Sequence, residues 1–164
     1  MLRRGGLICT LTLTLAACGS PKASVRPDVD MLCGTWTSES GAHERWEIDG
    51  DNLVGQAHNG EELEQLTLLA QGQGHVYIVQ PGQAAPTQFE PIDPSAARFS
   101  VDTPRGATIW VWANYEHDFP QEIHYALFAD EGRLEAAIVG PGEGEAPSVM
   151  TWSFTRSASC GVDS

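Results

Sequence analysis

Short apolar runs alternate with turn-forming residues along most of the chain, and polar and apolar positions alternate within many of the runs. Glu44, Trp46 and Ile48 share one face of such a run, and Ile123 and Tyr125 share one face of another. A period of two with one apolar face is typical of strands in an antiparallel sheet. The pattern predicts strands at 34–38, 43–49, 53–58, 62–70, 75–80, 86–91, 97–102, 108–114, 121–129, 133–139 and 148–157.

Tight-turn sequences separate these runs. Asp49-Gly50-Asp51-Asn52 and Asn59-Gly60 contain residues that tolerate a positive φ. No segment has an amphipathic helical stripe longer than two turns. About ten short strands indicate a barrel or a sandwich. We therefore expect an all-β fold, a single antiparallel β-barrel of about 8–10 strands with little helix.

The amino-terminal segment has the pattern of an export signal. Arg3 and Arg4 precede an apolar run over 7–17, which is shorter than the roughly twenty residues that span a bilayer. The run ends in Leu15-Ala16-Ala17-Cys18, which resembles the bacterial lipobox. This resemblance implies a signal peptide over 1–17 and a lipid on Cys18 that tethers the chain to a membrane. Gly19 after the cysteine favours the outer membrane, facing the periplasm. The alternative is an ordinary signal peptide with an incidental cysteine.

The rest of the chain divides into three parts. Residues 18–32 lack apolar periodicity and are expected to form a flexible tether. The barrel domain is expected over 33–160, with a short tail over 161–164. Of the four cysteines, Cys9 would leave with the signal and Cys18 would carry the lipid. Cys33 and Cys160 remain, and in an oxidising compartment they predict one disulfide. Two free thiols are the alternative.

The chain is acidic, with 22 acidic and 9 basic residues. Removing Arg3 and Arg4 with the signal leaves 7 basic residues against 22 acidic ones, a formal charge of −15. This balance argues against nucleic acid as a partner, because phosphates require a basic face. It also argues against direct contact of the domain with anionic lipid, so the lipid on Cys18 would make the membrane contact. The simplest interpretation of the charge is solubility.

Two residues at the ends of the domain resemble a lipocalin signature. Gly34-Thr35-Trp36 is similar to the lipocalin G-x-W, and Arg156 is placed like the arginine that packs on that tryptophan. The resemblance implies that Trp36 and Arg156 close one end of the barrel, where a guanidinium can stack on an indole.

Residues 33–157 also resemble an uncharacterised bacterial family of secreted or anchored lipocalin-like proteins. The most specific part is Glu116-His117-Asp118-Phe119-Pro120-Gln121. Further matching parts are His43 to Trp46, the strand around Glu64, Gly132 to Ala136, and Trp152 to Arg156. This resemblance implies the fold and implies no activity.

Within the loop, Glu116, His117, Asp118 and Phe119 allow three interpretations. In the structural one, Asp118 caps the turn, His117 bonds the backbone and Phe119 plugs the barrel edge. The second is gating of a ligand. The third is a metal site or acid–base catalysis by His117 oriented by Asp118, although adjacent residues on a turn rarely bind one ion.

Glu44 and Glu64 each share a strand face with large apolar residues, so both are expected to point into the barrel. A carboxylate in an apolar lumen is costly unless it is paired or protonated. Internal hydrogen bonds would make both structural; otherwise they mark the polar end of a ligand pocket with aromatic walls. The aromatic residues could equally form a plain core. The candidate ligand-binding residues are Glu44, Trp46, Glu64, Tyr77, Trp112, Asn114 and Tyr125.

Familiar catalytic and cofactor-binding strings are missing from the sequence, so no catalytic residue, cofactor or metal is predicted. The leading hypothesis is an anchored barrel that binds a small, partly apolar ligand at the cell envelope. A structural or protein-interaction lipoprotein with a filled barrel is the alternative, with no protein partner identified. An enzyme that uses Glu44 or His117 on a small molecule is the second alternative. Cavity volume separates the first two.

Overall fold

The computed structural model describes residues 28–60, 62–99, 105–144 and 146–161. Within these ranges, ten antiparallel strands form a closed barrel in the order β1-β10-β9-β8-β7-β6-β5-β4-β3-β2. The predicted all-β barrel is confirmed, and a ten-strand antiparallel barrel is compatible with a lipocalin-like fold. The strands are β1 Gly34–Ser38, β2 His43–Asp49, β3 Asn52–His58, β4 Leu63–Gln71, β5 Gly74–Pro81, β6 Thr87–Ile92, β7 Thr108–Ala113, β8 Glu122–Phe128, β9 Arg133–Gly140 and β10 Ser148–Ser159.

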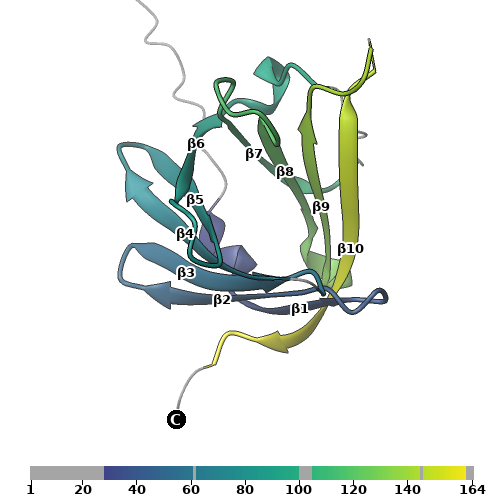
Figure 1. Ribbon diagram of the computed structural model, residues 1–164. Coiled ribbons are helices and arrows are strands. Elements are labelled where there is room, and N and C mark those ends of the chain that lie inside the picture. Colours follow the sequence, from purple (N-terminus) through teal and green to yellow (C-terminus); the bar gives the residue numbers. More distant parts are fainter. Residues whose placement is uncertain (1–27, 61, 100–104, 145, 162–164) are drawn as a thin grey trace, which may run out of the picture.

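Every strand pairs with its neighbours in sequence, and β1 pairs with β10 to close the ring. Figure 1 looks into this ring, with β1–β3 along one side and β7–β10 along another. Because consecutive strands are antiparallel, their connections alternate between the two barrel ends. The β1–β2, β3–β4, β5–β6, β7–β8 and β9–β10 connections therefore lie at one end, which we call the loop end. The chain enters and leaves the barrel at the opposite end, which we call the closed end.

One predicted strand, 97–102, is not borne out over its described part. Residues 97–99 are not in a strand; they follow a short 3-10 helix, η2, at Pro94–Ala96. The backbone N–H groups of Arg98 and Phe99 donate to the Glu122 carboxylate, at 2.6 and 3.4 Å. These donors are therefore taken by a side chain rather than by a neighbouring strand. Residues 100–102 of the prediction lie outside the described residues.

The closed end is covered by a 3-10 helix, η1, at Val29–Leu32. Val29 and Leu32 are buried in the core, so these residues, which the sequence assigns to the tether, pack with the barrel. The Nε1–H of Trp36 donates to the Leu32 carbonyl of η1 at 2.7 Å. The purple turn of η1 is visible behind the ring of strands in Figure 1.

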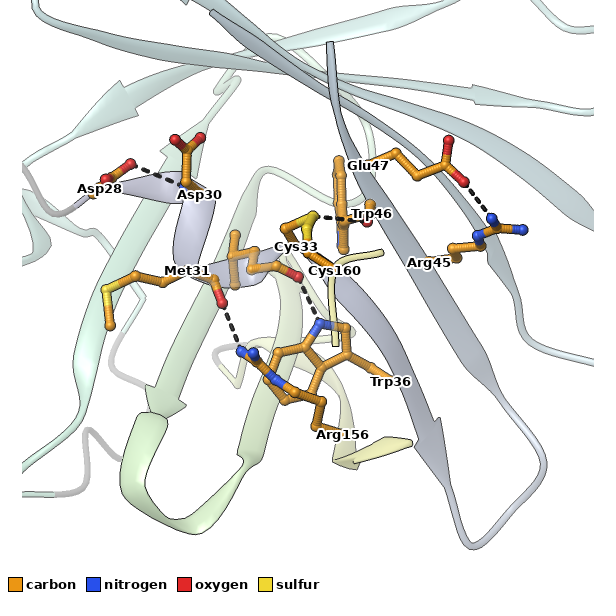
Figure 2. The surroundings of a disulfide bond; sticks show 11 residues. Asp28, Asp30, Met31, Cys33, Trp36, Arg45, Trp46, Glu47, Arg156 and Cys160 are labelled. Atoms are coloured by element: carbon orange, nitrogen blue, oxygen red, sulfur yellow. Dashed lines mark hydrogen bonds and ion pairs between the residues drawn. A yellow bond between two sulfur atoms is a disulfide. The ribbon is translucent and has the colours of Figure 1, made fainter. Parts of the chain in front are cut away.

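Trp36 and Arg156 meet at this end, as the sequence predicts. They are paired across β1 and β10, and the guanidinium carbon lies 4.3 Å from the centre of the Trp36 ring. Arg156 also donates through Nη2 to the Met31 carbonyl at 2.7 Å. Figure 2 shows the guanidinium between the indole and the η1 backbone. The arginine therefore joins the last strand to both the first strand and η1.

The predicted disulfide between Cys33 and Cys160 is present, with the two Cα atoms 5.3 Å apart. It joins the residue before β1 to the residue after β10. It therefore fixes the two ends of the barrel chain beside the contact between Trp36 and Arg156. The helices of the described part are single short turns, so none of them has the length or the apolar run that crossing a bilayer requires.

Candidate functional site: a cavity in the barrel with a buried carboxyl group

A cavity of about 340 Å³ occupies the half of the barrel nearest the loop end. Its walls are mainly apolar side chains from the inner faces of the strands, and loop residues form its rim. The wall residues include Val79, Phe89, Ile123, Ile138, Trp152 and Phe154. Rim residues include Ala42, Asn59, Pro81, His117, Phe119 and Pro120. The barrel is therefore not filled at this end.

The Glu44 carboxyl group lies at the inner end of this cavity, on β2. Its side chain is 8 % exposed. The Tyr125 hydroxyl lies 2.9 and 2.8 Å from Oε1 and Oε2 of Glu44, and the Trp46 Nε1–H donates to Oε2 at 3.1 Å. The Tyr77 hydroxyl lies 3.2 Å from that of Tyr125. When Tyr125 donates to Glu44, Tyr77 can donate to Tyr125, so the three strands β2, β5 and β8 are linked by one polar chain.

Burial is the largest influence on the protonation of Glu44. It raises the pKa of this carboxyl from 4.5 to about 7, against the hydrogen bonds from Tyr125 and Trp46, which lower the pKa, and with a further rise from the charge of Glu64. Burial also raises the pKa of Glu64, and the neighbouring Glu62 raises it further. The partners of Glu44 are uncharged donors, so they stabilise the carboxylate without neutralising it. Glu44 is thus poised to exchange a proton near neutral pH.

Four aromatic rings form the floor beneath Glu44. The ring of Tyr77 lies 6.1 Å from that of Trp46, 5.2 Å from that of Trp112 and 6.1 Å from that of Tyr125, measured between centroids. Trp112 and Tyr125 meet edge to face at 5.6 Å. Trp46 and Trp112 are each 1 % exposed. Edge-to-face and tilted packing of this kind is favourable for aromatic rings, so the floor is a packed aromatic layer.

The structure brings together four of the seven predicted ligand-binding residues. Glu44, Glu64, Tyr77 and Tyr125 line the cavity. Trp46 and Trp112 do not line it; they lie beneath it in the aromatic floor. Trp112 donates from Nε1 to the His75 carbonyl at 2.8 Å. Asn114 is also outside the cavity lining; its side chain donates to the Gln88 carbonyl at 2.9 Å and accepts from the Glu116 N–H at 3.2 Å.

The loop between β7 and β8 is held by its own hydrogen bonds. His117 Nδ1 lies 2.8 Å from the Pro120 carbonyl oxygen, and its ring meets Phe89 edge to face at 5.8 Å. Gln121 donates to the carbonyls of Tyr115 and His117 at 3.2 and 2.9 Å. The turn is capped by Asn114, and Asp118 is exposed to solvent. His117 therefore bonds the backbone, while the predicted capping role of Asp118 belongs to Asn114.

Phe119 from the same loop lines the cavity rim. Its ring lies against Gly140, where a Cβ atom would come within 2.8 Å of the ring. Gly140 therefore provides the space that lets Phe119 cover the edge of the barrel.

Two histidines at the rim were missed in the sequence analysis. His43 and His58 stack with ring centroids 5.2 Å apart, and both line the cavity. They are paired across β2 and β3, whose turn begins after Asp49. Counting residue pairs back from the tight turn, where Asp49 pairs with Asn52, pairs His43 with His58. This hairpin register is the sequence signal that would have placed the two imidazoles together.

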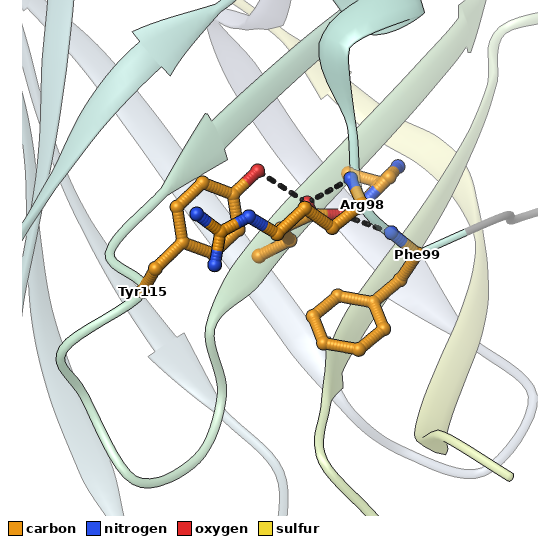
Figure 3. Close-up of polar contacts among 5 residues, drawn as sticks. Arg98, Phe99 and Tyr115 are labelled. Atoms are coloured by element: carbon orange, nitrogen blue, oxygen red, sulfur yellow. Dashed lines mark hydrogen bonds and ion pairs between the residues drawn. The ribbon is translucent and has the colours of Figure 1, made fainter. Parts of the chain in front are cut away.

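A second polar cluster was also missed, on the outer face of β8. Glu122 is fully buried, although its parity places it on the side of the sheet away from the lumen. Besides the two backbone donors described above, it accepts from the Tyr115 hydroxyl at 2.7 Å and lies 2.8 Å from His124 Nε2. Figure 3 shows Arg98 lying over the Tyr115 ring, with its guanidinium carbon 3.5 Å from the ring centre. Residues 97–99 thus cover this part of the outer face.

The charge environment of Glu122 is the reverse of that of Glu44. Burial raises the pKa of Glu122, but hydrogen bonds from the Tyr115 hydroxyl, the Arg98 N–H and His124 outweigh it, so its pKa lies below the usual value of 4.5. In turn, burial and the Glu122 carboxylate raise the pKa of Tyr115 to about 12. Glu122 is therefore a charged structural anchor for residues 97–99.

A larger hollow of about 590 Å³ lies at the closed end, between η1 and the β2–β3 and β4–β5 turns. Much of its lining is exposed turn residues such as Asp51 and Gln73. The rest of its lining comes from 91–94 and 109–112, which include the buried Trp110 and Trp112.

Among the described residues, no group of three or more His, Cys, Asp or Glu side chains is arranged to hold a metal ion. The interior of the barrel is instead an apolar cavity with the buried carboxyl group of Glu44 at its inner end and histidine side chains at its rim. Comparison with known proteins gives no match to a protein-family model, to a curated protein or to a solved structure.

Proposed function

We propose that this chain is a lipid-anchored protein of the bacterial cell envelope, of the lipocalin-like type, whose barrel binds a small, partly apolar ligand. The observation that carries the proposal is the cavity of about 340 Å³ inside the barrel, with Glu44 at its inner end. Small-molecule sites are typically concave, largely apolar and provided with a few polar groups that orient the ligand. A cavity of this volume lies at the lower end of the usual range of about 300–1,000 Å³.

The polar groups of the cavity are well placed for such a role. Glu44 and the Tyr125 hydroxyl meet at its inner end, and Glu64 lies on the wall. The walls around them are apolar, so these groups would orient one end of a ligand whose remaining surface is apolar. A filled structural barrel would instead have side chains packed throughout the lumen.

Binding is favoured over catalysis by the contacts of the two candidate catalytic residues. His117 directs Nδ1 to the Pro120 carbonyl within its own loop. Glu44 is surrounded by the Tyr125 and Trp46 donors. The described cavity lining contains no serine, cysteine or lysine, and its phenol groups, Tyr77 and Tyr125, are held in the hydrogen-bonded chain with Glu44; Thr87 is the remaining hydroxyl of the described lining.

The anchor rests on the sequence, because Cys18 lies outside the described residues. Nine residues lie between Cys18 and Asp28, where the described part of the chain begins. The acidic domain has little attraction for anionic lipid, so a lipid on Cys18 would hold it at the membrane. The closure of the barrel by Trp36 and Arg156 supports the lipocalin-like assignment. Gly19 favours an outer-membrane location facing the periplasm.

One preparation tests both parts of the proposal: protein purified from the envelope of its own cells, studied by intact mass spectrometry. Under denaturing conditions we expect a chain that begins at Cys18 and carries diacylglycerol. Under native conditions we expect an additional small molecule that is released on unfolding. A Cys18→Ser control should lose the lipid and keep residues 1–17. An unlipidated chain would contradict the anchor, and a folded protein that holds no small molecule would contradict ligand binding.

A further inference from the structure

The charged groups of the cavity have one sign. Its lining contains the carboxyl groups of Glu44 and Glu64, and none of the lining residues described is a lysine or an arginine. Arg45, next to Glu44 in sequence, points outward and forms an ion pair with Glu47. Burial of Glu44 is therefore not offset by a cationic side chain of the barrel.

The other titratable groups of the described lining lie on β2, β3, β4, β5 and β8 and in the β7–β8 loop. Tyr125 on β8 and Tyr77 on β5 are buried phenols whose pKa values burial raises well above 10.0, so they stay neutral. Glu64 on β4 adds negative charge. His43 on β2, His58 on β3 and His117 in the β7–β8 loop line the cavity toward the rim. The inner end of the cavity thus has acidic groups and hydrogen-bond donors, with imidazoles only toward its rim.

We infer that the ligand is an amphiphilic amine, a small molecule with one positively charged nitrogen and an apolar body. The inference rests on the proposed function, because it names the ligand class of the same cavity. The ammonium group would lie against Glu44 at the inner end, and the apolar body against Val79, Ile123, Ile138 and Phe154. No lysine or arginine of the described lining faces Glu44, so an ammonium group would supply the positive charge next to it. The ammonium and the Glu44 carboxylate would form a charge-assisted hydrogen bond.

Apolar walls favour an organic cation over an inorganic ion. A metal ion would need several oxygen or nitrogen ligands around it, and no three His, Cys, Asp or Glu side chains of the described residues are arranged to hold one. An anionic amphiphile would place like charges together in a confined space, which is unfavourable. A neutral amphiphile would gain the apolar contacts without the ion pair.

Three probes with one octyl chain separate these possibilities: octylamine, 1-octanol and octanoate, each titrated into the protein by calorimetry at about pH 8. An alkylamine is charged there, as a lysine side chain with a pKa of about 10.4 is. We expect octylamine to bind at least about tenfold more tightly than 1-octanol, because buried charge pairs of this kind are worth that much or more. Octanoate should bind most weakly.

The Glu44→Gln variant assigns the preference to this residue. It keeps the size and an acceptor oxygen but removes the charge, so octylamine should lose about tenfold in affinity while 1-octanol changes by less than about twofold. Retained 1-octanol binding shows that the variant is folded with its cavity intact. Glu47→Gln, a substitution of an exposed carboxylate on the same strand, is the matched control and should leave both affinities unchanged.

Each contrary outcome has a distinct meaning. Equal binding of octylamine and 1-octanol, or tighter binding of octanoate, would overturn the inference and leave the proposed binding function standing. A preference for octylamine that survives in Glu44→Gln would overturn the role of Glu44 in selecting the amine. Binding of none of the three probes would overturn the inference together with the proposed function.

Discussion

Glu44 and Glu122 are both buried carboxyl groups, but they lie on opposite faces of the barrel sheet and meet different partners. Glu44 faces the lumen and receives two side-chain donors, from Tyr125 and Trp46. Glu122 faces outward and receives backbone donors as well as the Tyr115 hydroxyl and His124. Burial therefore dominates for Glu44 and raises its pKa, whereas hydrogen bonding dominates for Glu122 and lowers its pKa.

The raised pKa of Glu44 predicts that Glu44→Gln stabilises the empty barrel at alkaline pH. Below the ordinary value of 4.5 the carboxyl is neutral in both states, and as pH rises through the folded pKa of about 7 the folded protein loses stability relative to a neutral side chain. The difference should grow from near zero at pH 4.5 to about 3 kcal/mol above pH 7. Urea unfolding of the two proteins across this range measures it. A wild-type protein more stable than the variant at high pH would contradict the assignment.

The lowered pKa of Glu122 predicts the opposite trend for Glu122→Gln. Its carboxylate contributes stability above the ordinary value of 4.5, and this is lost as pH falls through the lower folded pKa. The variant places an amide N–H₂ among groups that donate, so we expect a loss of about 2–3 kcal/mol near neutral pH. The loss should shrink in acid, as followed by urea unfolding. The exposed Glu116→Gln is the control, and an equal cost at all pH values would argue against a charged Glu122.

Strand periodicity could predict the orientation of Glu44 but not the burial of Glu122. The alternation of Glu44 and Trp46 with polar residues places Glu44 in the lumen, and the structure agrees. The same alternation on β8 places Ile123 and Tyr125 in the lumen, where they line the cavity, and leaves Glu122 and His124 on the opposite face. Their burial depends on residues 97–99 crossing over them, a contact between segments more than twenty positions apart. Local pattern contains no information about such a contact.

At the scale of elements, the hairpin of β2 and β3 holds the aromatic floor in place. Trp46 is paired with Gly55 across the two strands. A Cβ atom at Gly55 would lie 2.8 Å from the indole and 2.5 Å from the Arg45 carbonyl oxygen. The missing side chain therefore lets the Trp46 ring pack against the β3 backbone, beneath Glu44.

This close approach predicts that Gly55→Ala destabilises the domain. Because backbone and indole would both have to move, we expect a cost of about 1–3 kcal/mol, the usual range for overpacking. Denaturant unfolding gives the free energy, and near-ultraviolet circular dichroism reports the environment of the tryptophans. Gln56→Ala, at the exposed neighbouring position, should change neither quantity appreciably. An unchanged Gly55→Ala protein would show that Trp46 does not need this space.

Most strand positions could be predicted because each combines an alternating pattern with a turn signal at its end. The sequence predicts a strand at 97–102 because its pattern does not show which acceptors the backbone N–H groups of this segment bond. Residues 97–99 satisfy two of them with the Glu122 carboxylate rather than with a strand. Likewise, Trp46 and Trp112 have the parity of lumen residues, but the cavity stops above them. Parity gives the direction of a side chain and not its depth along the barrel.

At the scale of the whole molecule, the closed end combines η1, the Trp36–Arg156 contact and the Cys33–Cys160 disulfide. The disulfide spans 127 positions of sequence. In the chain-entropy model, closing so long a loop stabilises the folded state by about 3–5 kcal/mol. The double variant Cys33→Ala, Cys160→Ala should lose about this amount in urea unfolding. Reduction of the wild-type protein should give a similar loss, and no loss in either case would contradict a structural role for the bond.

The closed end and the loop end of the barrel differ in structure. The disulfide, the Trp36–Arg156 contact and η1 lie at the closed end, and the cavity occupies the other half of the lumen. The lumen can therefore stay unfilled in the half nearest the loop end while β1 and β10 remain paired at the closed end. The difference between the two ends also predicts that a bound ligand contacts residues near the loop end and not residues at the closed end.

The cavity in the half of the barrel nearest the loop end is the proposed binding site. The most direct test is methyl NMR of the folded protein during titration with 1-octanol. We predict saturable shifts for the methyl groups of Val79, Ile123 and Ile138, which line the cavity, and none for Val54 or Val149, which lie outside its lining. Shifts that do not saturate, or that centre on Val29 and Ile109 at the closed end, would contradict the claim.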